Sequence, residues 1–126
     1  MKGTQRDPHY PGRAAIEAYG AGGFSFAGMS HRGAILALPA GIWAWSPNSF
    51  AEINEVSLAR VIAARGEFDI LLIGTGREHR PLPETLQLRL RDLGIRFDVM
   101  TTAAAASTYN VLLAEGRRAA VALLPD

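Results

Sequence analysis

Apolar residues in the second half of the chain form short blocks that alternate between helical and extended spacing. A run at near-helical spacing from Phe50 to Ile62 predicts a helix that starts at the cap candidates of residues 46–49 and ends at Gly66. The continuous aliphatic run 69–73 predicts a strand that is covered on both faces. Residues 81–93 then return to helical spacing, with leucines on one stripe and Gly94 behind them.

The same alternation continues to the end of the chain. Residues 95–99 alternate between apolar and polar side chains, which predicts a strand with one drier face. Thr101 and Thr102 are cap candidates for a helix that ends at Gly116, and residues 118–124 predict a last strand. Strands that alternate with helices in this way require right-handed crossovers and a mostly parallel sheet with helices on its faces.

The first half of the chain has a different pattern, in which short apolar segments are separated by glycines. This pattern predicts an antiparallel β meander with strands at residues 16–19, 24–26, 33–38 and 42–45. Trp43 and Trp45 are two positions apart, so a strand places both indoles on one face. Burial of that face against a helix is the favoured interpretation, and a homodimer interface is the alternative.

Together these patterns predict an α/β fold, with a mostly parallel sheet, helices on its faces and an N-terminal antiparallel β meander. We expect residues 1–12 to be a flexible tail, because prolines interrupt them and no apolar block is present. Residues 13–126 are expected to form a single domain, since no linker separates the two halves.

Composition narrows the classes of function. Of the 126 residues, 48% are hydrophobic and 20% are charged, which excludes a disordered chain. Thirteen basic and twelve acidic side chains give a formal charge of +1, which argues against nucleic acid as a partner, and the twelve arginines are scattered along the sequence. The chain has no cysteine, no apolar stretch long enough for a membrane span and no evident transit peptide, so a cytoplasmic location is expected.

Polar residues follow two of the predicted parallel strands, where the crevice of an open α/β sheet lies. Two loops lead there into helix N-termini, which attract anions, and arginine and histidine add hydrogen-bond donors. A small anionic ligand is the binding hypothesis for this edge, and turn formation by the glycines with capping by the threonines is the competing structural interpretation. The candidate ligand-binding residues are Gly74, Thr75, Gly76, Arg77, His79, Arg80, Thr101 and Thr102, with Tyr109 and Asn110 of the following helix added to them.

No complete catalytic or metal-binding motif accompanies these residues. Gly74-Thr75-Gly76 begins a dinucleotide fingerprint, but His79 occupies the position of its third glycine. Ser25 lacks the surroundings of a nucleophile elbow, and the three histidines form no paired ligand motif. We therefore predict no cofactor, no metal and no catalytic residue. Asn110 lies within a predicted helix, where a structural hydrogen bond is the favoured explanation.

Several of these segments resemble a known family. Ile16-x-x-Tyr19, Leu38-Pro39, residues 70–76 and residues 108–117 are similar to motifs of the adipogenesis-associated Mth-domain family, whose mitochondrial branch is complex I assembly factor 3. The resemblance implies a three-layer Mth-like α/β fold and nominates a shared set of residues without established catalytic roles. These are Gly74, Thr75, Gly76, Tyr109, Asn110, Glu115 and Arg117.

Two functions are consistent with the sequence. The first is a non-enzymatic binding or assembly module with a protein partner, which follows from the resemblance and from the lack of a complete catalytic constellation. The second is an enzyme or sensor that holds a small anionic metabolite at the carboxyl edge of the parallel strands.

Overall fold

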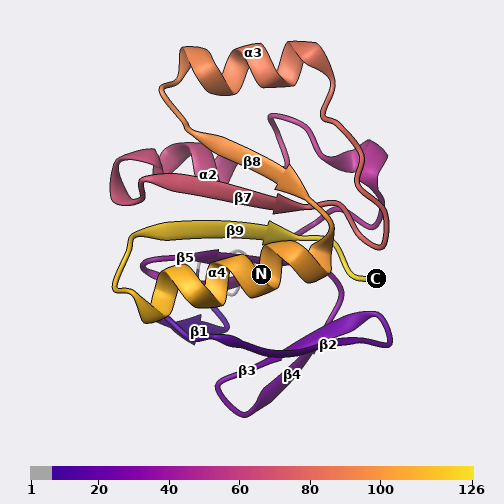
Figure 1. Ribbon diagram of the computed structural model, residues 1–126, viewed down its shortest axis with the longest axis vertical. Helices are drawn as coiled ribbons and strands as arrows, with labels where there is room; N and C mark the ends of the chain where they lie inside the picture. The colour runs from indigo at the N-terminus through magenta and orange to yellow at the C-terminus, as the bar shows by residue number, and fades with distance from the viewer. Residues whose placement is uncertain (1–6) are drawn as a thin grey trace.

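The computed structural model describes residues 7–126 and contains two sheets, one of six strands and one of three (Figure 1). The six-stranded sheet has the order β1-β6-β5-β9-β7-β8. Its strands are β1 (Tyr10–Pro11), β5 (Ile35–Leu38), β6 (Gly41–Ala44), β7 (Ile70–Gly74), β8 (Phe97–Met100) and β9 (Ala119–Leu123). The smaller sheet consists of β2 (Ile16–Gly20), β3 (Gly23–Phe26) and β4 (Met29–Arg32) in that order.

The large sheet combines a parallel and an antiparallel part. β7 pairs in parallel with both β8 and β9, as the alternation of helices and strands in the sequence predicts. β5 pairs antiparallel with β9 and β6, and β1 continues the antiparallel part beyond β6. Some of the predicted meander therefore extends the main sheet, and the rest forms a separate sheet beside it.

Side chains of the large sheet alternate between its two faces, and an apolar layer packs against each face. On one face Leu71 and Ile73 of β7 pack with α2 (Ala59–Ala63) and α3 (Glu84–Asp92). On the other face Leu72 packs with α4 (Thr102–Ala114) and with the apolar side of the small sheet. Figure 1 shows α4 in front of β5 and just below β9, with the small sheet further below it. This arrangement confirms the predicted three-layer α/β fold.

The region of residues 46–67 differs from the single helix that the sequence predicts. It is divided into η1 (Phe50–Glu52), α2 and η2 (Arg65–Glu67). Ile53 is extended, and three hydrogen bonds join Asn54 and Ser57. The Ser57 N–H donates to Asn54 Oδ1 at 2.9 Å, the Asn54 N–H donates to Ser57 Oγ at 3.0 Å, and Ser57 Oγ donates to the Asn54 carbonyl at 3.2 Å. These local side-chain bonds compete with the backbone hydrogen bonds of a helix and interrupt it before α2 begins. The single helix predicted from the apolar spacing is therefore wrong.

Two further strands were not predicted. Tyr10 and Pro11 pair with Ile42 and Gly41, so this part of the expected tail belongs to the sheet, whereas residues 1–6 lie outside the described residues. β4 is polar and carries no apolar alternation, but it pairs along its whole length with β3. Strand pairing therefore orders segments that the hydrophobic pattern does not mark.

Trp43 and Trp45 are buried against the first helical region, as the favoured interpretation predicts. The indole N–H of Trp45 donates to the Ser57 carbonyl at 2.7 Å, and the Arg60 guanidinium lies 4.6 Å from the ring centroid of Trp43. Only 9% of Trp43 and 6% of Trp45 is exposed. The two indoles are therefore buried inside the molecule and do not form the exposed surface that a homodimer interface at this position would need.

Candidate functional site

The loops after β7 and β8 meet at one edge of the sheet. The Thr75 N–H donates to the Met100 carbonyl at 2.9 Å, and the Thr102 N–H donates to the Gly76 carbonyl at the same distance. The structure thus brings the two predicted halves of the crevice together. A ligand can bind at this edge only through polar groups that the fold itself does not use.

Thr102 is fully buried and joins three elements at this edge. Its Oγ1 accepts a hydrogen bond of 2.8 Å from the Gly76 N–H and donates one of 2.6 Å to the Leu124 carbonyl. The Leu124 N–H in turn donates to the Gly74 carbonyl at 3.0 Å. The hydroxyl of Thr102 therefore fixes the start of α4 to the ends of β7 and β9, and both of its hydrogen-bonding roles are used internally.

Gly74 allows this close junction because it has no side chain. A Cβ atom at position 74 would lie 2.8 Å from Leu123 Cδ2, 2.9 Å from Thr102 Cα and 3.0 Å from Thr102 Oγ1. Gly76 has a φ of +95°, which side chains rarely allow. Both glycines are thus explained by the packing and the turn at this junction.

The other two threonines also bond within the chain. Thr75 Oγ1 donates to the Glu78 carbonyl at 2.6 Å and accepts from the Arg80 N–H at 3.2 Å. Thr101 is the N-cap of α4, and its Oγ1 accepts from the Ala104 N–H at 3.2 Å. The hydroxyls of all three threonines that the sequence nominated for an anion are therefore engaged in hydrogen bonds within the chain.

A shallow groove of about 280 Å³ lies beside this junction. Arg77, Glu78 and Arg80 line one side, and Asn48 to Phe50 line the other. The Arg80 guanidinium lies 5.5 Å from the centroid of the Phe50 ring. His79 instead lines a separate groove of about 230 Å³ next to Phe97–Val99. The structure therefore brings the two arginines together and separates them from the histidine.

Tyr109 and Asn110 lie on α4 and do not line the groove of Arg77 and Arg80. The Asn110 side chain accepts from the Ile16 N–H at 2.8 Å and donates to the Ile16 carbonyl at 2.9 Å. This pair of bonds attaches β2 to α4, which accounts for an asparagine inside a helix. Tyr109 is 1% exposed, and burial raises the pKa of its hydroxyl.

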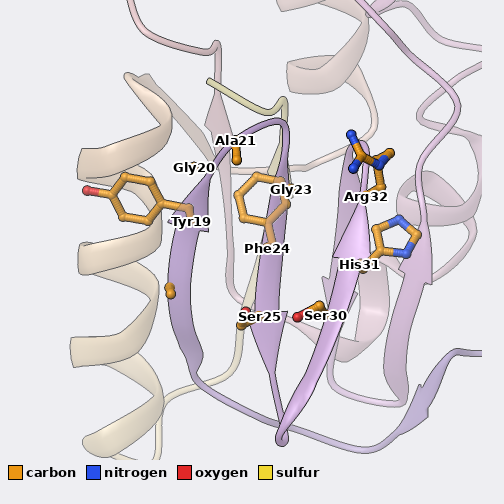
Figure 2. Close-up of a pocket in the computed structure, with 10 residues that line it drawn as sticks. Tyr19, Gly20, Ala21, Gly23, Phe24, Ser25, Ser30, His31 and Arg32 are labelled. Carbon is orange, nitrogen blue, oxygen red and sulfur yellow. The ribbon is translucent and has the colours of Figure 1, made fainter.

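Sequence reasoning missed a concave surface on the small sheet, with a volume of about 430 Å³ (Figure 2). Small residues contribute most of it, and Ser25 and Ser30 are paired across β3 and β4 in its floor. Arg32 is at one end. The small residues glycine, alanine and serine along β2 and β3 are the sequence signal for this surface. The same residue types also predict turns, so the signal does not identify a concave surface.

A pair of histidines also lies outside the predicted site. The ring centroids of His9 and His31 are 4.9 Å apart. Burial lowers the pKa of His31, and the nearby His9 lowers it further, while a hydrogen bond involving Ala34 opposes the shift. Within residues 7–126, no group of three or more histidine, aspartate or glutamate side chains is arranged to hold a metal ion.

Residues 16–124 match the model of the family described as protein of unknown function (DUF498/DUF598). The chain belongs to this family. It is 42% identical over 120 residues to an uncharacterized protein of Rhodobacter capsulatus, and the match covers 95% of this chain and 91% of that protein. It is also 33% identical over 110 residues to NADH dehydrogenase (ubiquinone) 1 alpha subcomplex assembly factor 3 of Xenopus tropicalis. That match covers 87% of this chain but only 60% of the assembly factor.

Solved structures of similar proteins have the same fold. A protein named as an outer membrane protein from Bartonella henselae is 45% identical, with a TM-score of 0.88 over 93% of this chain and 98% of that one. A Bordetella pertussis protein named as a Mth938-like domain is 31% identical, with a TM-score of 0.76 over 90% and 86% of the two chains. The resemblance to Mth-domain proteins is thus confirmed. No helix in residues 7–126 is long and apolar enough to cross a membrane.

Proposed function

We propose that this chain is a non-enzymatic protein-binding module that acts in the assembly of a larger complex. The observation that carries the proposal is the kinship with assembly factor 3, which extends over 87% of this chain. The chain spans about 60% of the length of that relative. The two proteins therefore share this domain, and the remaining segments of the assembly factor have no counterpart in the match.

The geometry at the carboxyl edge of the sheet supports this proposal over a catalytic one. Preorganised catalysis needs donors and acceptors that are aimed at a substrate. The hydroxyls of Thr75, Thr101 and Thr102 are instead directed to backbone groups of the chain. A domain whose buried polar groups serve its own junctions is suited to presenting a rigid surface to another protein.

A second candidate function rests on the groove beside the junction. Arg77 and Arg80 contribute two guanidinium groups to it, and the groove volume of about 280 Å³ is sufficient for a small anion. Under this alternative the chain is an enzyme or sensor for an anionic metabolite. Both arginines are exposed, which limits the affinity that they supply.

Two experiments separate the candidates. The first is a thermal-shift screen of anionic metabolites, because a ligand selective for the folded state raises its stability with concentration. Flat curves are expected, and a saturable shift that Arg77→Ala abolishes would favour the metabolite.

The second experiment is purification of the tagged protein from its native cells after cross-linking, with cell fractionation to test the proposed cytoplasmic location. A stoichiometric partner is expected, and its absence together with a metabolite hit would overturn the assembly role.

A further inference from the structure

Four arginines from three separate segments of the sequence gather at the edge of the sheet opposite the junction. They are Arg13, Arg96, Arg117 and Arg118, and we call them the arginine rim. Arg96 precedes β8 and Arg118 precedes β9, so both lie where the parallel strands begin. Because these strands are parallel, their first residues share one edge.

Hydrogen bonds place the members of the rim on either side of the start of β7, where the Asp69 N–H donates to the Arg118 carbonyl and the Leu71 N–H to the Arg96 carbonyl, each at 2.9 Å. The Arg118 guanidinium binds the Asp69 carboxylate at the start of β7, with an Nη2–Oδ1 distance of 2.7 Å. Arg13 Nη2 donates to the Arg117 carbonyl at 3.0 Å. The pKa of Asp69 is lowered mainly by its hydrogen bond with Arg118, and the charges of Arg117 and Arg96 lower it as well. The single carboxylate of Asp69 thus lies within the field of three guanidinium groups.

Half of this positive charge is not neutralised within the rim. The only other ion pair of the rim within the described residues joins Arg117 to Glu115, at a loose 3.8 Å. No carboxylate in residues 7–126 lies within ion-pair distance of the exposed Arg96. The rim and its two carboxylates carry a formal charge of +2, while the rest of the chain has nine basic and ten acidic side chains.

We propose that the arginine rim binds a carboxylate-rich segment of a protein partner. This inference rests on the proposed assembly function and names the chemistry of its partner. A planar guanidinium matches a carboxylate with two parallel hydrogen bonds, as Arg118 and Asp69 already demonstrate within the chain. Arg96 and Arg117 present the same group to the exterior, where glutamate or aspartate side chains of a partner can pair with them.

The charge pattern favours an acidic segment over a membrane or a polyanion. Asp69 and Glu115 are interspersed with the guanidinium groups and repel a uniformly anionic surface, whereas a flexible segment can place its carboxylates between them. The formal charge of the whole chain is only +1, so it gives little long-range attraction to lipid or nucleic acid. Recognition at the rim therefore depends on short-range pairing.

The test uses the full chain and a fluorescein-labelled oligoglutamate peptide at low ionic strength, with binding measured by fluorescence anisotropy. Arg96→Glu/Arg117→Glu is expected to weaken binding about ten-fold or more, since two attractive contacts become repulsive. The control Arg32→Glu/Arg89→Glu changes the formal charge of the chain by the same amount and is expected to retain most of the affinity. Equal losses in both variants would overturn the proposal, because binding would then follow net charge alone.

A second pair of variants tests the rim in the opposite direction. Asp69→Asn removes a carboxylate that competes with the peptide and is expected to tighten binding two-fold or more, about the value of one exposed pair. Glu84→Gln changes the charge equally but lies at the start of α3, outside the rim, and it is expected to have no effect. Tighter binding of phosphatidylglycerol vesicles than of the peptide would also overturn the proposal.

Failure of this inference can be distinguished from failure of the assembly function. If cross-linking identifies a stoichiometric partner that Arg96→Glu/Arg117→Glu does not release, the assembly role stands and the rim is not its docking surface. If that variant releases the partner and the control variant does not, both proposals are supported. Thermal unfolding of each variant verifies that the substitutions leave the domain folded.

Discussion

Replacement of Thr102 by valine tests whether the junction at the carboxyl edge is structural. Valine keeps the shape of threonine but removes the hydroxyl that accepts from the Gly76 N–H at 2.8 Å and donates to the Leu124 carbonyl at 2.6 Å. Thr102 is 0% exposed, so water cannot replace either bond without a rearrangement of the chain. Two buried backbone groups are left unpaired in Thr102→Val.

The magnitude follows from the cost of such groups. An unpaired buried donor or acceptor costs about 1–3 kcal/mol, so the two together predict a loss of roughly 2–6 kcal/mol. This is a large fraction of the stability of a domain, which is about 5–15 kcal/mol. At this chain length it corresponds to a decrease of roughly 10 °C or more in Tm.

Two control variants isolate the hydroxyl. Thr102→Ser retains the hydrogen bonds and loses one methyl group, which costs about 1 kcal/mol. Thr101→Ala removes the N-cap bond to the Ala104 N–H at a more accessible position and is expected to cost about 0.5–2 kcal/mol. Urea unfolding followed by circular dichroism measures all three free energies. A loss below about 0.5 kcal/mol for Thr102→Val, or an equal loss for Thr102→Ser, would refute the structural account of the junction.

Three further predictions concern other parts of the fold. Asn110→Ala leaves the N–H and carbonyl of Ile16 without their partner, so the free energy of unfolding should fall by about 1–3 kcal/mol. Hydrogen exchange at the Ile16 amide should become faster, and unchanged exchange would contradict the attachment of β2 to α4. Because burial raises the pKa of Tyr109 above 10.0, the folded state holds this proton more tightly, and stability should fall as the pH rises above that value; Tyr109→Phe should flatten this dependence. Because burial and His9 lower the pKa of His31 below 6.5, stability should decrease as the pH falls through that value, and a similar slope in His31→Gln would argue against this cause.

Local sequence signals predicted the elements that position the junction. The aliphatic run that became β7 and the cap at Thr101 are local features, since a buried strand needs apolar side chains on both faces and a helix N-terminus needs an acceptor. The order of helices and strands then placed Thr75 and Thr102 at the same edge. No local signal distinguishes a threonine that bonds to the chain from one that awaits a ligand.

Features that depend on distant residues could not be predicted. The Asn110 side chain binds the backbone of Ile16, which is 94 positions away in the sequence. The break between η1 and α2 depends on a balance between the helical ladder and the hydrogen bonds that the side chains of Asn54 and Ser57 make to each other's backbone N–H, and apolar spacing carries no information about that balance. In both cases a polar side chain decides the structure at a position that the hydrophobic pattern leaves open.

The arginine rim has the same origin on a larger scale. Arg13, Arg96 and Arg118 have no common motif, and along the sequence they read as scattered charges. Parallel strands bring the loops before β7, β8 and β9 to one edge, and the link between β1 and β2 adds Arg13 through its bond to the Arg117 carbonyl. The rim therefore depends on the helical connections through α3 and α4, which keep β7, β8 and β9 parallel. The parallel pairing of β7 with β8 and β9 fixes these strand starts relative to one another, and the crossover through α4, which Thr102 anchors at the carboxyl edge, carries the chain from Arg96 to Arg118.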